Sequence, residues 1–284
     1  MEGERLMKEL SLQEIQQEEI RLLEKVDKIC EENGLIYYLA FGSLIGAVRH
    51  QDIIPWDDDL DLWMPSADIQ KLAEIINSDP ETFKPLYVIT RKNEKFYPYG
   101  LPRITNTDFR YVDDVDRTNN KVNMGVFLDV YPIEPYGNDG KTGLKIYKHI
   151  KRLNHFYQIY VDPNNTQNKW KVSIKYLVHI ALRVIFGNTY NEKIDNRIDR
   201  YLEKHTSAMD RFVGSPRWNT VYFVHFDKSW IQERKKVPFN RIEAYVPGEY
   251  DAILKGIYGD YMKLPPEEKR VAYHHYKIFR KAEE

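Results

Sequence analysis

Four aspartates lie within five positions of the chain, at Asp57, Asp58, Asp59 and Asp61, directly behind a proline and a tryptophan. The apolar residues that follow predict a strand, and side chains alternate between the two faces of a strand. Asp57, Asp59 and Asp61 are therefore expected on one face, and Asp58 on the other. Carboxylates on one face repel each other unless a cation lies between them, and such oxygen ligands suit Mg²⁺ or Mn²⁺. The segment predicts a divalent metal site.

A second motif lies upstream, at Phe41-Gly42-Ser43, where a predicted strand turns into a short predicted helix. Gly42 would let the backbone approach a ligand closely. The free N–H groups at the start of the helix, together with the Ser43 hydroxyl, would suit a phosphate group. A Gly-Ser turn alone is common. A strand, a Gly-Ser turn, a helix and then Asp59 and Asp61 on the next strand form a more specific pattern, which indicates metal-assisted phosphoryl transfer.

A third carboxylate is expected to complete this site. Asp129 is a lone acid in the apolar segment 126–131, where an unpaired charge would be costly. The alternatives are a metal ligand and a buried ion pair, and the other acids favour the metal ligand. A second metal or Asp129 itself could activate an acceptor hydroxyl. The acids at 113, 114 and 116 resemble this group in composition, but no strand pattern follows them, and we interpret them as a solvated loop.

Basic side chains near the acids are candidate phosphate donors, namely Arg49, His50 and Arg103. Arginine is always charged and has forked donors, which suits phosphate. Arg49 could instead only balance the charge of the acids. The predicted substrate-binding residues are therefore Gly42, Ser43, Arg49, His50 and Arg103.

The elements that would position these residues follow from hydrophobic periodicity. Ser11 and Glu14 form a capping-box pattern before a predicted helix, which should end at Asn33-Gly34. Helices are also predicted over 44–50 and from 65–66 to 76. Strands are predicted over 35–41, 59–64, 86–90, 99–104 and 126–131, the last ended by Pro132. This mixed order indicates an α/β or α+β fold, with a mixed sheet core over about residues 10–135.

The remainder of the chain is expected to belong to the same single domain, 1–284. It would comprise a basic helical insertion over about 140–202 and a C-terminal part over about 211–284. Between Lys141 and Arg183 nine Lys and Arg residues accompany one acid, so this segment carries +8 and the rest −9, against a total of −1. The amphipathic stretch 169–186 could lie on a membrane surface or pack on the protein's own core, and the second is favoured.

Composition restricts the class of protein further. The near-neutral total charge gives no general attraction to nucleic acid, and the single cysteine, Cys30, excludes a disulfide framework and a thiolate zinc site. No signal-peptide pattern and no apolar run of about 18 residues is present. These features predict a cytoplasmic protein without a membrane-spanning helix.

Segments 41–50 and 54–61 together resemble the signature of the LicD family, which also includes domains of fukutin and the fukutin-related protein. Segment 127–132 resembles the family's second motif. Residues 246–262, then Pro265-Pro266 and His274-His275, resemble its C-terminal end. The resemblance implies a nucleotidyltransferase-like fold and transfer of phosphocholine from CDP-choline to sugar hydroxyls of teichoic acid or lipopolysaccharide precursors. Eukaryotic relatives move ribitol phosphate.

The resemblance also implies partners: a CDP-choline donor, a lipid-linked glycan acceptor, and Mg²⁺ or Mn²⁺ held by Asp57, Asp59, Asp61 and Asp129. The basic insertion would then contact the inner face of the membrane. Two alternatives remain. The first is a different CDP-activated alcohol or nucleotidyl transfer, and the second is a nucleotide-binding protein without turnover, which the full set of acids disfavours.

Overall fold

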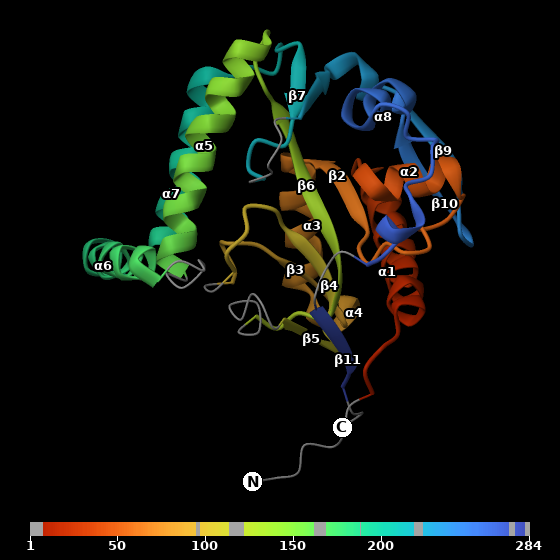
Figure 1. The fold of residues 1–284 in the computed structure, drawn as a ribbon, viewed down its shortest axis with the longest axis horizontal. Helices are drawn as coiled ribbons and strands as arrows, with labels where there is room; N and C mark the ends of the chain where they lie inside the picture. Colours follow the sequence, from red (N-terminus) through yellow and green to blue (C-terminus); the bar gives the residue numbers. More distant parts are fainter. Residues whose placement is uncertain are drawn as a thin grey trace.

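The computed structural model describes residues 8–94, 97–113, 122–161, 169–187, 189–218, 224–272 and 276–281. These residues form a mixed α/β structure around a mixed sheet, in which one long strand runs through the middle of the molecule (Figure 1). The predicted fold class is confirmed. Among the described residues, no helix has both the length and the apolar character needed to cross a bilayer.

The central sheet brings distant parts of the sequence side by side. Its strands lie in the order β1 (Tyr38–Leu39), β2 (Asp61–Pro65), β6 (Val126–Pro135), β4 (Arg103–Asn106) and β3 (Leu86–Ile89). β2 and β6 are parallel, with Asp61 opposite Asp129, and the other pairs along this order are antiparallel. On the other side of β6, Arg103 lies opposite Asp129. The register thus places two acids and one arginine in a row across three strands.

β6 continues through Pro132, so the prediction that this proline ends the strand is wrong. The Asp129 N–H donates to the Leu60 carbonyl, whereas the Val130 N–H donates to the Pro102 carbonyl on the opposite side. N–H groups alternate sides along a strand, so the nitrogen of Pro132 faces the same side as that of Val130. The first residue of β4, Arg103, lies opposite Asp129, so β4 does not extend alongside Pro132 and no ladder hydrogen bond is lost. Beyond it, β6 pairs with β7 (Phe212–Gly214), which pairs with β8 (His225–Asp227).

Two other predicted strands are shorter or shifted. Only Tyr38–Leu39 of the predicted strand 35–41 pairs in the sheet, because helix α2 (Phe41–Arg49) already begins at Phe41. Phe41 has φ 43°, an uncommon conformation for a residue with a side chain. β4 begins at Arg103 rather than at residue 99, after a loop that contains Pro102. β5 (Phe109–Asp113) lies where no strand was predicted, and residues 114 and 116 of that acidic segment are outside the described residues.

The first helix follows its capping signals. α1 (Leu12–Asn33) starts at Ser11 with the full capping box to Glu14, and Gly34 ends it in the left-handed conformation, φ 64°. α1 contacts β6. α3 (Ser66–Ser78) contacts β2, β3 and β6, and a short helix, α4 (Pro80–Phe83), joins it to β3.

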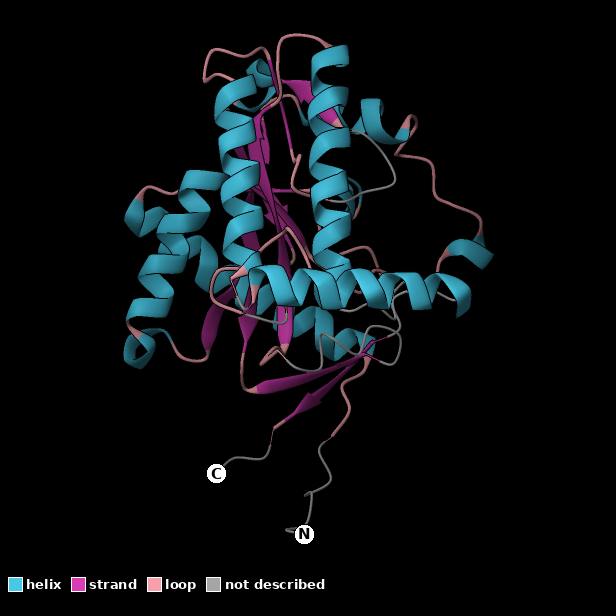
Figure 2. Cartoon of the chain, turned by 90° about the vertical axis from the view of Figure 1, so that its left-hand side faces the viewer, coloured by secondary structure: helices cyan, strands magenta, loops and turns pink. Residues whose placement is uncertain are grey.

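Three helices form the part of the chain that was predicted to be a basic insertion: α5 (Gly140–Val161), α6 (Lys169–Phe186) and α7 (Tyr190–His205). α5 and α7 pack side by side, and α6 crosses their ends (Figure 2). The C-terminal part returns to the site region. The hairpin of β9 (Arg234–Phe239) and β10 (Ile242–Pro247) contacts β1 and α2, and α8 (Tyr250–Tyr258) contacts α2. Two 3-10 helices cover Lys228–Ile231 and Glu267–Lys269, and β11 (Tyr276–Arg280) pairs with β5.

Candidate active site

Three carboxylates converge where β2 begins beside the middle of β6. One oxygen of each of Asp59, Asp61 and Asp129 lies within 4.8 Å of the other two. Asp61 and Asp129 are buried and lie opposite each other in the sheet, whereas Asp59 is half-buried and belongs to the loop before β2. Three carboxylates at this spacing are close enough for one divalent ion to draw them into a shared coordination shell.

The surroundings of Asp61 strongly disfavour its charged form. Its side chain is buried, and its Oδ1 has no hydrogen-bond partner among the described residues. Burial, and then the charges of Asp59, Asp129 and Asp57, raise the pKa of Asp61 well above its usual range, while a hydrogen bond with Tyr131 opposes the rise. A buried oxygen without a partner, facing like charges, is the chemistry that a divalent cation would satisfy, so the donor set fits the predicted metal.

Asp129 also has the buried ion pair that was considered as the alternative to a metal ligand. The Arg103 Nε donates to Asp129 Oδ1 at 2.6 Å, and the guanidinium lies 4.9 Å from the Tyr99 ring centre and 4.2 Å from that of Phe127. Burial lowers the pKa of Arg103, but the charges of Asp129, Tyr97 and Tyr99 and the hydrogen bond with Asp129 together raise it overall. The structure therefore places Arg103 on a carboxylate, with its Nη1 directed at Met124 Sδ, and a phosphate contact for Arg103 stays a prediction.

The Gly-Ser turn lies directly against the acidic segment. The Asp61 N–H donates to Ser43 Oγ at 2.8 Å, and Ser43 is only 2% exposed. A Cβ on Gly42 would lie 2.6 Å from Asp57 Oδ2, so a side chain there would displace that carboxylate. The turn thus fixes the start of β2 and the position of Asp57, and this contact could not be predicted from the motif alone.

Arg49 and His50 lie beside each other rather than on the acids. The Arg49 Nε donates to His50 Nε2 at 3.0 Å, and its Nη1 donates to the Tyr261 carbonyl at 2.7 Å. Burial, followed by the charge of Arg49, lowers the pKa of His50. These contacts tie the end of α2 to the segment after α8, and a phosphate contact for either residue stays a prediction.

The expectation that Asp58 points away from the other acids is wrong. Oxygens of Asp57, Asp58 and Asp59 lie within 4.8 Å of one another, and Asp58 is buried. The alternation argument fails because β2 begins only at Asp61, so residues 57–60 form a loop whose side chains need not alternate.

Sequence reasoning missed a sixth carboxylate, on α1. Glu19 is 1% exposed, its Oε2 has no partner among the described residues, and burial followed by Asp59, Asp57, Asp58 and Asp129 raises its pKa. A signal existed, because Glu19 lies four residues after buried Ile15 and therefore on the apolar stripe of the helix.

Tyrosines from three elements also surround the acids. Tyr131 on β6 shares a face with Asp129, two residues earlier, so strand alternation could have identified it. The Tyr276 hydroxyl on β11 donates to the Asp58 carbonyl, and the charges of Asp61, Asp57 and Asp59 help burial to raise the pKa of Tyr258 on α8. No local signal predicts the last two. His274 and His275 lie outside the described residues.

An acidic group shared by two adjacent strands, with a Gly-Ser helix start against it, defines a nucleotidyltransferase-like site. The family model described as LicD/FKTN/FKRP, nucleotidyltransferase domain, matches residues 34–167. This range contains the Gly-Ser turn and Asp57, Asp59, Asp61 and Asp129. Residues 34–167 therefore belong to the LicD family.

Relatives extend the similarity to most of the chain. It is 24% identical over 274 residues to the lipopolysaccharide cholinephosphotransferase LicD of Haemophilus influenzae, covering 94% of this chain and 97% of that protein. It is 51% identical over 47 residues to the human ribitol 5-phosphate transferase FKRP, covering 16% of this chain and 10% of that protein. Mannosyltransferase regulator 14 of Saccharomyces cerevisiae is 20% identical over 267 residues, covering 84% of this chain and 28% of that protein.

Proposed function

We propose that the protein is a metal-dependent phosphotransferase that moves phosphocholine from CDP-choline to a sugar hydroxyl of a cell-surface glycan precursor. The convergence of Asp59, Asp61 and Asp129, with a buried oxygen of Asp61 that has no partner in the described part of the chain, carries the proposal. The similarity to a lipopolysaccharide cholinephosphotransferase over nearly the full length of both chains favours phosphocholine and a glycan acceptor. The similarity to a ribitol 5-phosphate transferase keeps another CDP-activated alcohol as the main alternative donor.

The acids would hold Mg²⁺ or Mn²⁺, with Asp57 at their edge, and the bound ion would offset the charge of the donor's pyrophosphate. The chain's own residues prepare this site. Ser43 fixes the backbone of Asp61, and Arg103 orients Asp129 from the neighbouring strand. The Nη2 of Arg103, beside Asp129, would be the donor closest to hand for a phosphate of the donor substrate.

The test is release of CMP from CDP-choline in the presence of Mg²⁺ and a glycan acceptor. Asp59→Asn and Asp61→Asn should each lower turnover by more than about 100-fold, since even changes behind metal ligands cost about 10- to 100-fold. Asp108→Asn, at an exposed acid away from the site, is the matched control and should keep full turnover.

A panel of nucleotide donors separates the alternatives. No CMP from CDP-choline, with Mg²⁺ binding intact, would overturn the choline assignment. Turnover of another CDP-activated alcohol, or of a nucleoside triphosphate, would identify the donor. Binding of nucleotide without turnover of any donor would instead favour a protein without catalytic activity.

We further propose that α6 brings the enzyme to the membrane that carries its acceptor. Leu182 and Phe186 pack against the cluster formed with α5 and α7, as expected for a helix on its own core. Leu177, Val184 and Ile185, however, are 70%, 79% and 67% exposed, so α6 also presents apolar side chains that nothing among the described residues covers. An open apolar face within a strongly basic segment suits the interface of an anionic bilayer.

A further inference from the structure

A second hollow lies apart from the acids, where β3 ends and β4 begins. It has a volume of about 550 Å³, within the range of small-molecule sites. α3 and α7 form facing walls, and the loops 90–93 and 99–102 close one side. None of the aspartates of the acidic site lines it.

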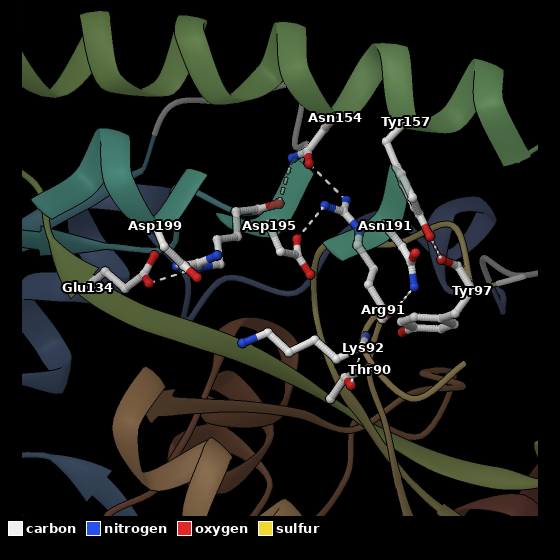
Figure 3. A network of polar contacts seen from close by, with 11 residues as sticks. Thr90, Arg91, Lys92, Tyr97, Glu134, Asn154, Tyr157, Asn191, Asp195 and Asp199 are labelled. Carbon is white, nitrogen blue, oxygen red and sulfur yellow. Dashed lines mark hydrogen bonds and ion pairs between the residues drawn. The ribbon is translucent and has the colours of Figure 1, made fainter. Parts of the chain in front are cut away.

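Two arginines build the polar wall of this cavity (Figure 3). The Arg91 Nη1 donates to Asp195 Oδ1 at 3.2 Å and its Nη2 to Asn154 Oδ1 at 2.8 Å. The Arg217 Nε donates to Glu134 Oε1 at 2.8 Å and its Nη2 to Asp199 Oδ1 at 2.5 Å. Planar carboxylates and guanidinium groups are thereby fixed in position before any ligand arrives.

This wall retains capacity for further hydrogen bonds. Arg91 is 4% exposed, and its Nε has no partner among the described residues. The side chain of Asp199 remains 33% exposed, so its carboxylate can accept from a ligand. The Lys92 side chain, which is exposed, extends along the same network (Figure 3).

The cavity is also lined by apolar residues, Ile69, Ala73, Leu101 and Pro132. A lining of polar and apolar groups together matches a sugar, which presents hydroxyls at its edge and C–H groups on its face. Charge argues against a nucleotide here, because three acids, Glu74, Asp195 and Asp199, offset the three basic residues Arg91, Lys92 and Arg217. A pyrophosphate would meet no net positive charge.

One side chain separates the cavity from the acidic site. Tyr99 lines the cavity, and its ring centre lies 4.9 Å from the guanidinium carbon of Arg103. Arg103 in turn bonds Asp129 at 2.6 Å. A ligand in the cavity would therefore be connected to Asp129 of the acidic site through two side chains, Tyr99 and Arg103.

From this arrangement we propose that the cavity binds an uncharged sugar unit of the acceptor, and that the donor occupies the acidic site alone. This inference rests on the proposed function, because calling the sugar an acceptor assumes the proposed transfer reaction. Its test does not depend on turnover, because sugar binding is measured directly.

The experiment uses saturation-transfer NMR with glucose, galactose and N-acetylgalactosamine at millimolar concentration. Ala73→Trp fills the cavity from α3 without touching the ion pairs, and should weaken the sugar signals at least about tenfold. Ala67→Trp places the same side chain on an exposed position of the same helix and should leave the signals unchanged. Asp61→Asn should lose turnover and keep the sugar signals.

The opposite results overturn the inference: no signal with the wild-type protein, full signals in Ala73→Trp, or equal loss in Ala67→Trp. Competitive displacement of the sugar by CDP-choline would assign the cavity to the donor and likewise reject it. Sugar binding without CMP release would leave the cavity assignment standing and reject only the proposed reaction.

Discussion

At the scale of single residues, the site gathers several carboxylates close together. Asp61 and Glu19 are both buried, each has an oxygen without a partner among the described residues, and the pKa of each is raised. Arg103 compensates only Asp129 by a direct ion pair. The folded state therefore holds repulsion that a cation would relieve.

Removing Asp61 should consequently stabilise the metal-free protein and abolish its stabilisation by metal. With a chelator at neutral pH, Asp61→Asn is expected to unfold at a higher temperature than the wild type. Mg²⁺ should raise the unfolding temperature of the wild type by mass action and leave the variant nearly unchanged. Thermal unfolding of both proteins with and without Mg²⁺ checks this, and an equal response to Mg²⁺ would contradict it.

Glu19 should make stability depend on pH. Its pKa is raised in the folded protein, so the folded state holds this proton more tightly than the unfolded chain does. Stability is therefore lost as pH rises from the ordinary value of 4.5 toward the raised one. Glu19→Gln should remove that loss and stabilise the metal-free protein at neutral pH.

Denaturant unfolding at pH 4.5 and pH 7.5 measures the effect of Glu19→Gln. Glu32→Gln, at an exposed position of the same helix, is the control and should keep the wild-type pH dependence. If Glu19→Gln keeps the wild-type dependence of stability on pH, the Glu19 carboxyl does not titrate between these two pH values.

At the scale of elements, α2 presses against the loop that leads to the acids. A Cβ on Gly46 would lie 2.5 Å from the Asp52 carbonyl oxygen and 3.3 Å from the Ile54 nitrogen, both backbone atoms. The helix and the loop are therefore in close contact at Gly46. The same loop leads to Asp57 and Asp59, so a shift of its backbone would move these acids.

Gly46→Ala should destabilise the protein by about 1–3 kcal/mol, the usual cost of overpacking. It should also lower turnover, because the loop that holds the acids must shift. Gly256→Ala in α8 is the matched control, since its Cβ would meet nothing within 4 Å. That variant should be neutral or stabilised, as alanine favours helix. Equal stability of the two variants, measured by denaturant unfolding, would refute the close contact.

Elements defined by local signals were predictable from the sequence, and elements defined by pairing were not. The capping box at Ser11 and the glycine at position 34 set α1 within its own residues. The start of β4 at Arg103 and the passage of β6 through Pro132 depend on which strand lies alongside. The acids of the site were identified by type and spacing, whereas Tyr276 reaches Asp58 from a strand that only the tertiary fold brings near.

At the scale of the whole molecule, α6 lies at the periphery, across the ends of α5 and α7 (Figures 1 and 2). Its exposed apolar residues are far along the chain from the acids. The fold thus separates the proposed membrane contact from the chemistry, and each can be altered alone.

Replacing Leu177 and Ile185 by Glu should abolish co-sedimentation with vesicles that contain anionic lipid. Turnover of a water-soluble acceptor should stay within about twofold of the wild type, since α6 does not line the acidic site. Met209→Glu, at another highly exposed apolar residue, is the control and should bind vesicles normally. Vesicle binding that survives the double change would rule out α6 as the contact.

The pairing of β11 with β5 has a consequence for the order in which the protein becomes active during synthesis. Ile278 accepts from the Leu10 N–H, and Tyr276 donates to the Asp58 carbonyl, so the last described strand closes over segments made much earlier. A growing chain can assemble α1, β2 and β6 while these residues are still inside the ribosome. It cannot complete the surroundings of Asp58 until they emerge. The surroundings of Asp58 are therefore completed only after Tyr276–Arg280 have emerged and β11 can pair with β5.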